Sequence, residues 1–146
     1  MTEIGFYQLG GRSLESVLPK LLEKAFAAGH RILVRCRDAE QLAMLDEHLW
    51  TYEDASFLPH GTEGAAHPIL LVAGEVTPAG YSLLALPGGA LSPDVTDFRR
   101  ILYLFDGEDA AELAQARNDW KAAKTNPDVK PVYWKAGDDG RWQQVA

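Results

Sequence analysis

Residues 31–49 read RILVRCRDAEQLAMLDEHL and contain the two patterns that decide the fold. The apolar run Arg31–Cys36 is typical of a buried strand. Asp38, followed three residues later by Gln41, forms a capping-box pattern, so a helix is expected to begin there. We expect this helix to run to about Leu49. Its apolar residues recur at helical spacing: Leu42, Leu45 and Leu49.

The segment before this stretch repeats the same order of elements. Glu3–Leu9 is a predicted strand, and Ser13 is a candidate N-cap for a helix that Gly29 ends as a C′ glycine. Pro19 lies inside this helix and predicts either a kink or a later start. Strand, helix, strand and helix in the first third of the chain predict an α/β fold. We expect a central, mostly parallel sheet flanked by helices.

The rest of the chain continues the pattern and is expected to complete one domain over residues 1–146. A short helical turn is expected at Val95–Arg100. Trp50–Gly61 has no clear period and reads as a loop whose aromatic residues either pack in the core or face a partner. Further strands are expected at His67–Ala73, Tyr81–Leu86, Ile101–Phe105 and Pro131–Lys135, with a last segment at Arg141–Val145.

The last long helix is predicted over Glu108–Lys124 and carries the candidate binding surface. Acidic residues lie in its first turn and basic residues near its end, as the helix macrodipole favours. Asn126-Pro127 is expected to end the helix. At about 100° per residue, one stripe of this helix is basic and the stripe beside it is apolar. The basic stripe holds Arg117, Lys121 and Lys124. The apolar stripe holds Leu113, Ala116, Trp120 and Ala123.

Two interpretations of these adjacent stripes remain open at this point. A cationic row beside an apolar row suits a peptide with an acidic body and an apolar end. A solvated charged face above ordinary core residues produces the same spacing.

Charge is distributed unevenly along the chain. The formal net charge is −7 and the isoelectric point is about 5.0, which argues against general attraction to nucleic acid. Residues 113–135 nevertheless hold five bases and two acids. An acidic partner would therefore be drawn to this region alone. Cys36 is the single cysteine, so no internal disulfide can form. We see no secretory signal and no run of about 18 apolar residues, so a cytoplasmic protein without a membrane segment is expected.

Motifs for catalysis, cofactors and metals are not found. The glycines after the first strand lack both the Rossmann and the P-loop spacing, and the four histidines show no ligand spacing. Cys36 lies on a buried-type strand and is interpreted as a small hydrophobe. One alternative is a small α/β enzyme whose Arg117 and Lys121 bind an anionic metabolite. Another is direct binding of single-stranded DNA through Trp120 and Lys121, against which the overall acidity argues.

Several fragments resemble, in the same order, the chi subunit of bacterial DNA polymerase III. The most specific are LDEHLW at residues 45–50 and SFLPHG at residues 56–61. ARNDWKAAK at residues 116–124 and YWKAGDDGRW at residues 133–142 fit the same family. The resemblance implies a fold like a nucleotide-binding, Rossmann-like domain but without a nucleotide or other cofactor, and a non-enzymatic role in replication.

The same resemblance implies two partners. Family members join the clamp loader through the psi subunit and bind the acidic, Phe-ended C-terminal tail of single-stranded DNA-binding protein. The positions that match the tail-binding surface are Arg117, Trp120 and Lys121, and the helical wheel adds Lys124. Leu113 stands where some members carry a base and would line the pocket for the apolar end of the tail.

The psi-facing surface of the family corresponds here to Trp50 and Phe57. A helicase is a candidate competitor at the Trp50 surface.

Overall fold

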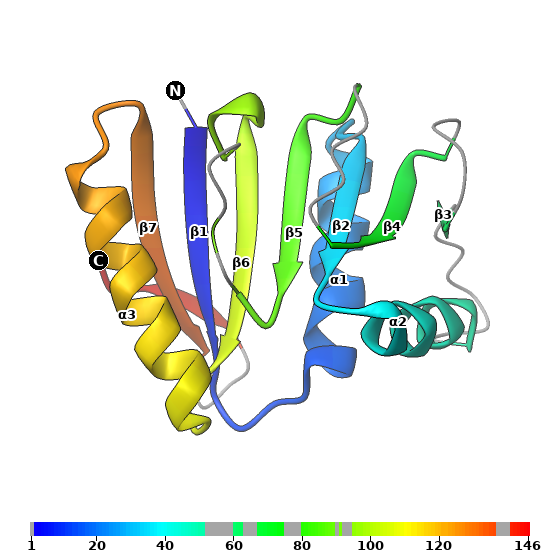
Figure 1. Cartoon of the computed structure of the whole chain (residues 1–146), viewed down its shortest axis with the longest axis horizontal. Helices are drawn as coiled ribbons and strands as arrows, with labels where there is room; N and C mark the ends of the chain where they lie inside the picture. The colour runs from blue at the N-terminus through cyan, green and yellow to red at the C-terminus, as the bar shows by residue number, and fades with distance from the viewer. Residues whose placement is uncertain are drawn as a thin grey trace.

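One mixed sheet organises the molecule. The computed structural model describes residues 2–51, 60–62, 67–74, 80–89, 91, 95–136 and 141–146, without the side chains of residues 50, 51 and 95. Within these residues eight strands form a single sheet in the order β3-β4-β2-β5-β6-β1-β7-β8 (Figure 1). The strands are β1 (Thr2–Leu9), β2 (Ile32–Cys36), β3 (His60–Gly61), β4 (Ile69–Ala73), β5 (Leu83–Pro87), β6 (Arg100–Asp106), β7 (Val129–Ala136) and β8 (Trp142–Gln144).

All pairings among the strands β1 to β7 are parallel. Only β8 runs antiparallel to its neighbour, β7. The described helices are α1 (Leu14–Ala27), α2 (Ala39–Thr51), α3 (Ala110–Thr125) and the 3-10 turn η1 (Val95–Asp97). The prediction of an α/β fold with a mostly parallel sheet is therefore confirmed.

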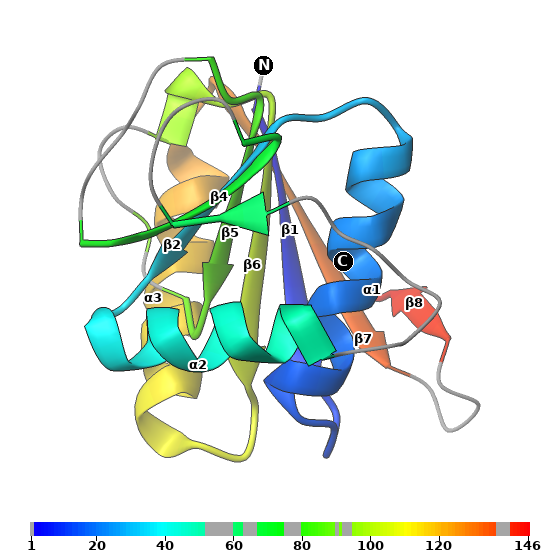
Figure 2. The same ribbon diagram turned by 90° about the vertical axis from the view of Figure 1, so that its right-hand side faces the viewer.

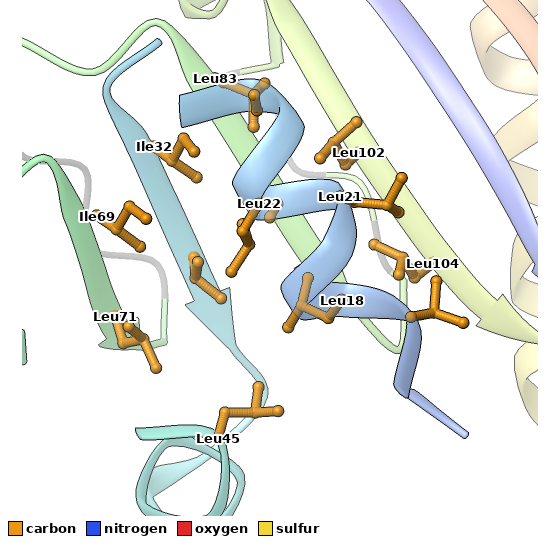
Figure 3. Packing of buried hydrophobic residues seen from close by; sticks show 14 of the residues in the cluster. Leu18, Leu21, Leu22, Ile32, Leu45, Ile69, Leu71, Leu83, Leu102 and Leu104 are labelled. Carbon is orange, nitrogen blue, oxygen red and sulfur yellow. The ribbon is translucent and has the colours of Figure 1, made fainter. Parts of the chain in front are cut away.

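The helices cover both faces of the sheet. α1 lies on one face and α3 on the other (Figure 2), and Leu45 and Leu49 of α2 pack into the same core cluster as α1. Leu18, Leu21 and Leu22 of α1 project onto the leucines and isoleucines of β2, β4, β5 and β6 (Figure 3). Because side chains alternate along a strand, β1, β2, β4, β5, β6 and β7 each contribute to both cores. In β1, for example, Phe6 is buried under α3 and Tyr7 on the α1 side.

Side chains at the helix ends explain where each helix begins. Ser13 caps α1, because its Oγ accepts a hydrogen bond from the backbone N–H of Ser16 at 3.2 Å. Asp109 caps α3 in the same way, so that helix begins at Ala110 and not at Glu108 as predicted. Gly29, after the end of α1, has a φ of 91°, which suits glycine at this position.

The prediction of a loop from Trp50 to Gly61 is partly wrong. α2 continues through Trp50 to Thr51, because neither glycine nor proline follows Leu49 to stop it. His60 and Gly61 form β3, the edge strand beside β4. The residues between, which include Phe57, lie outside the described part of the chain.

Candidate functional site

A groove of about 490 Å³ lies beside α3. We call it the α3 groove. Its lining comes from five parts of the chain: α3, the strands β1, β6 and β7, and residues 145 and 146. The lining residues are Gln8, Phe105, Leu113, Ala116, Arg117, Trp120, Tyr133, Lys135, Val145 and Ala146.

The apolar wall of the groove is continuous with the core. Trp120 is partly buried and meets two rings edge-on, Phe6 at 5.2 Å and Tyr133 at 5.7 Å between ring centroids. Leu113, two helical turns earlier, is partly buried against the same core cluster. These contacts hold the indole in one orientation while leaving part of it in the groove. The apolar stripe predicted from spacing therefore serves both as core and as groove wall.

Two cations line the α3 groove, and a third lies at its tryptophan. Arg117 and Lys135 are both exposed and belong to the lining. The Lys124 Nζ lies 5.8 Å from the centroid of the Trp120 ring, a distance at which an ammonium group is attracted to an indole. Lys121 is exposed on α3 but is not a lining residue. None of the described residues that line the groove has an acidic side chain, so the charged side chains of the lining favour an anion.

Asp119 is directed away from the groove although it precedes Trp120. Its carboxylate is buried and accepts a hydrogen bond from the Tyr103 hydroxyl at 2.6 Å. The Gln115 side-chain amide and the Leu91 backbone N–H also donate to it. This acid therefore stabilises the packing of α3 against β6.

A tyrosine beside Arg117 forms the polar part of the groove. The Tyr133 hydroxyl donates a hydrogen bond to the Gln8 side-chain oxygen. Burial raises the pKa of Tyr133, and the positive charge of Arg117 acts in the opposite direction. The guanidinium is therefore close enough to this phenol to influence it, and both groups face the same depression.

The end of the described chain completes the groove, which sequence reasoning missed. The Val145 backbone N–H donates to the Tyr133 carbonyl at 2.9 Å, and the Tyr133 N–H donates to the Ala146 carbonyl at 3.1 Å. These bonds extend the pairing of β8 with β7. The alternation of side chains along β7 could have indicated two of these groove residues, because it places Tyr133 and Lys135 on one face of the sheet.

The other predicted partner surface lies elsewhere. Trp50 is in the last turn of α2, a helix whose Leu45 and Leu49 pack into the core cluster on the α1 side of the sheet. Nothing is described for Phe57. The helices that carry the two tryptophans assigned to different partners, α2 with Trp50 and α3 with Trp120, thus pack into the core clusters on opposite faces of the sheet.

A smaller polar crevice of about 240 Å³ lies at the carboxyl ends of β1 and β6. Arg37, Gln41 and Glu112 line it, and burial raises the pKa of Glu112. Arg117 is not a lining residue of this crevice, so the cation assigned to an anionic metabolite is separated from the shifted acid. This arrangement does not favour the enzyme alternative.

Within the described residues, no group of three His, Cys, Asp or Glu side chains could hold a metal ion. No described helix is both long enough and apolar enough to cross a bilayer.

Comparison with known proteins identifies the family. Residues 1–127 match the family described as DNA polymerase III chi subunit, HolC. This chain belongs to the chi-subunit family. The resemblance seen in the sequence is therefore confirmed. The family match includes α3 and ends before β7 and β8.

Individual chi proteins are similar over shorter stretches. A Rickettsia prowazekii protein named "Probable DNA polymerase III subunit chi" is 27% identical over 70% of this chain and 61% of its own length. The DNA polymerase III subunit chi of Pseudomonas aeruginosa is 32% identical over 51% of this chain and 56% of its own. The Escherichia coli DNA polymerase III subunit chi is 33% identical over 38% of this chain and 37% of its own length. The chain thus spans less than two thirds of the length of these relatives.

Proposed function

We propose that this protein is a non-enzymatic accessory subunit of DNA polymerase III that binds the acidic C-terminal tail of single-stranded DNA-binding protein in the α3 groove. Through the psi subunit it would link the clamp loader to coated single strands. The observation that carries the proposal is the composition of the groove. An apolar wall built on Trp120 and Leu113 adjoins Arg117 and Lys135, with no acid among the described lining residues.

Each part of the tail has a suitable counterpart in the α3 groove. The terminal apolar side chain would pack against Trp120 and Leu113. The Arg117 guanidinium would bind a carboxylate with two parallel hydrogen bonds, a geometry that lysine cannot offer. Lys121, Lys124 and Lys135 would attract the aspartates of the tail body.

Moderate affinity is expected from these contacts. Each exposed ion pair contributes about 0.2–1 kcal/mol, so several pairs and one buried ring correspond to roughly micromolar binding, near −8 kcal/mol. Many tails on one coated strand would raise the effective concentration without any new contact. Binding is expected to weaken as salt rises, because the cations are exposed.

Calorimetric titration with a synthetic acidic peptide that ends in Phe tests this function. Arg117→Ala is expected to weaken binding about tenfold, equivalent to about 1.4 kcal/mol. Arg99→Ala is the matched control, because Arg99 is exposed and is not part of the groove lining. A peptide without its terminal Phe should bind more weakly to the unmodified protein. Equal affinity of the Arg117→Ala and unmodified proteins would exclude this groove as the tail site.

The psi partner is proposed for the other side of the sheet, around Trp50 at the end of α2 together with Phe57. Trp50→Ala should then abolish co-purification with psi while peptide binding in the α3 groove is retained. A helicase that used the same surface would compete with psi and not with the tail peptide. Loss of psi binding in Arg117→Ala but not in Trp50→Ala would contradict this assignment.

A further inference from the structure

A second cleft of about 490 Å³ lies on the α1 face of the sheet, between α1 and the β7–β8 pair. We call it the α1 cleft. α1 and β8 lie on the same side of the sheet, opposite α3 (Figure 2). The lining residues that matter here are Arg12, Lys20, Lys24, Trp134, Arg141 and Trp142. The function proposed above uses none of them.

Two tryptophans form the aromatic part of the α1 cleft, and a buried tyrosine orients them. The ring of Tyr7 stacks on Trp134 with centroids 6.2 Å apart and planes only 9° from parallel. Trp142 meets the same Tyr7 ring edge-on at 5.1 Å. Tyr7 is buried, whereas both indoles are only partly buried and line the cleft. The cleft therefore presents two indoles whose positions are set before any ligand arrives.

Four cations border these indoles. Lys20 and Lys24 are one turn apart on α1, which separates their Cα atoms by about 6 Å along the helix axis, while Arg12 precedes the helix and Arg141 precedes β8. All four side chains are exposed. No acid is found among the described lining residues, and Glu23, between the two lysines in sequence, is not one of them. The cleft is thus locally cationic on a chain with a formal net charge of −7.

We propose that the α1 cleft is a contact site for single-stranded nucleic acid. Each nucleotide carries one anionic phosphate and one aromatic face, and cations beside aromatic platforms match both. The charge complementarity also suits an acidic peptide. Such a peptide, however, carries no aromatic face at each residue to use both indoles. The expectation that overall acidity prevents contact with nucleic acid does not apply to a site whose own lining is cationic.

Part of the α1 cleft lies beyond the residues that the family model matches. Trp134, Arg141 and Trp142 follow residue 127, where the family match ends. The inference stands independently of tail binding, because the two sites are on opposite faces of the sheet. If both sites are used, a protein held by the tail would present the α1 cleft to DNA at high effective concentration. A weak contact would then be sufficient.

Fluorescence anisotropy with a labelled oligothymidylate of about 12 nucleotides tests the proposal on the full chain at low salt. Phosphate contacts from Arg12, Lys20 and Lys24 predict a slope of log K against log salt of about −2, since each contact on a single strand contributes about −0.7. Lys20→Gln/Lys24→Gln is expected to weaken binding about tenfold and to reduce the magnitude of the slope by about 1.4. Arg117→Gln/Lys121→Gln removes two cations from the opposite face and should leave binding within about twofold.

The tryptophans are tested by a graded pair of substitutions. Trp142→Ala should weaken oligonucleotide binding at least ~5-fold, and Trp142→Phe, which keeps an aromatic face, should weaken it less. Thermal unfolding of each variant reveals any loss of folding. The lysine variant remains decisive if Trp142→Ala does not fold, because Lys20 and Lys24 are exposed.

The two proposals can fail separately. Calorimetry with the acidic peptide should give unchanged affinity for Lys20→Gln/Lys24→Gln and reduced affinity for Arg117→Gln/Lys121→Gln. No oligonucleotide binding at low salt, or equal weakening by both double variants, would overturn the nucleic-acid site. Acidic-peptide binding that requires Lys20 and Lys24 would also overturn it, because the cleft would then be a second peptide site.

Discussion

The Nε2 atom of His48 lies 2.6 Å from the carbonyl oxygen of Glu15, a contact that joins α2 to α1. In a regular helix this carbonyl would accept the backbone N–H four residues later. That residue is Pro19, which has no N–H. His48 therefore supplies the missing donor, which places its ring proton on Nε2. This explains how α1 begins at Leu14 and continues through Pro19 to Ala27.

His48→Ala is expected to lower the free energy of unfolding by about 1–2 kcal/mol, because the Glu15 carbonyl loses its donor. Urea denaturation measures this difference. Pro19→Ala restores a backbone N–H that can bond to Glu15. In that background, His48→Ala should therefore cost measurably less. Equal costs in the two backgrounds would show that the histidine stabilises the protein through other contacts.

Asp119→Ala is expected to destabilise the protein by about 1–3 kcal/mol, because the buried Tyr103 hydroxyl loses its hydrogen bond to this carboxylate. Adding Tyr103→Phe to this variant should recover part of the loss, since the hydroxyl that has lost this hydrogen bond is then removed. Asp128→Ala, at an exposed position, serves as the matched control. Thermal or urea unfolding of the four proteins provides the comparison. Tail binding should persist in folded Asp119→Ala, because this carboxylate does not line the α3 groove.

Cys36 is expected to resist alkylation until the protein unfolds. Burial raises the pKa of its thiol from 9.0 to about 12, so the reactive thiolate is scarce in the native state. Iodoacetamide labelling at pH 8, followed by mass spectrometry with and without urea, measures this protection. Rapid labelling of the native protein would contradict the buried position.

The same thiol predicts a pH dependence of stability. Its folded pKa is raised, so its contribution is fully present below pH 9.0 and is lost as pH rises toward about 12. The stability difference between the unmodified protein and Cys36→Ala should therefore shrink over this window, by at most about 1.4 kcal/mol per pH unit. Denaturation at several alkaline pH values checks the sign. A constant difference would show that the thiol has similar pKa values in both states.

Lys135→Ala is expected to weaken binding of the acidic tail peptide more than Lys121→Ala does. Lys135 lines the α3 groove from β7, whereas Lys121 is outside the lining. The expected losses are about 3–5-fold and less than about 2-fold, within the range of exposed ion pairs. Calorimetry at two salt concentrations measures both. The reverse order would indicate that the peptide body follows α3 and avoids β7.

Charged substitutions at Val145 test whether the last residues of the chain contact the acidic peptide in the α3 groove. Its side chain is 56% exposed and lines the α3 groove. Val145→Asp should weaken tail binding about 3-fold and Val145→Lys should strengthen it by a similar factor, because the side chain would face the acids of the peptide. Both variants lose the same apolar side chain, so each controls for the other. Equal effects of the two substitutions would exclude an electrostatic role for this position.

Local patterns in the sequence were sufficient to predict the fold class and several buried positions of this protein. The apolar run Arg31–Cys36, the cap at Asp38 and the repeat of strand and helix were enough to predict a parallel α/β sheet. The buried position of Cys36 followed from the same run. These features depend on residues within a few positions of one another, where helical and strand periodicities apply. The stripe containing Leu113 and Trp120 was visible for the same reason.

Only the tertiary structure determined which residues face the apolar and basic stripes of α3. The order β6-β1-β7 brings Phe105, Gln8 and Tyr133 side by side under α3, although about 125 residues separate Gln8 from Tyr133. Strand order and register are long-range properties that no local period encodes. Lys135 therefore joins the groove while Lys121, on the predicted stripe, does not. Trp134, the residue between Tyr133 and Lys135, faces the α1 cleft because alternation along β7 directs it to the other side of the sheet.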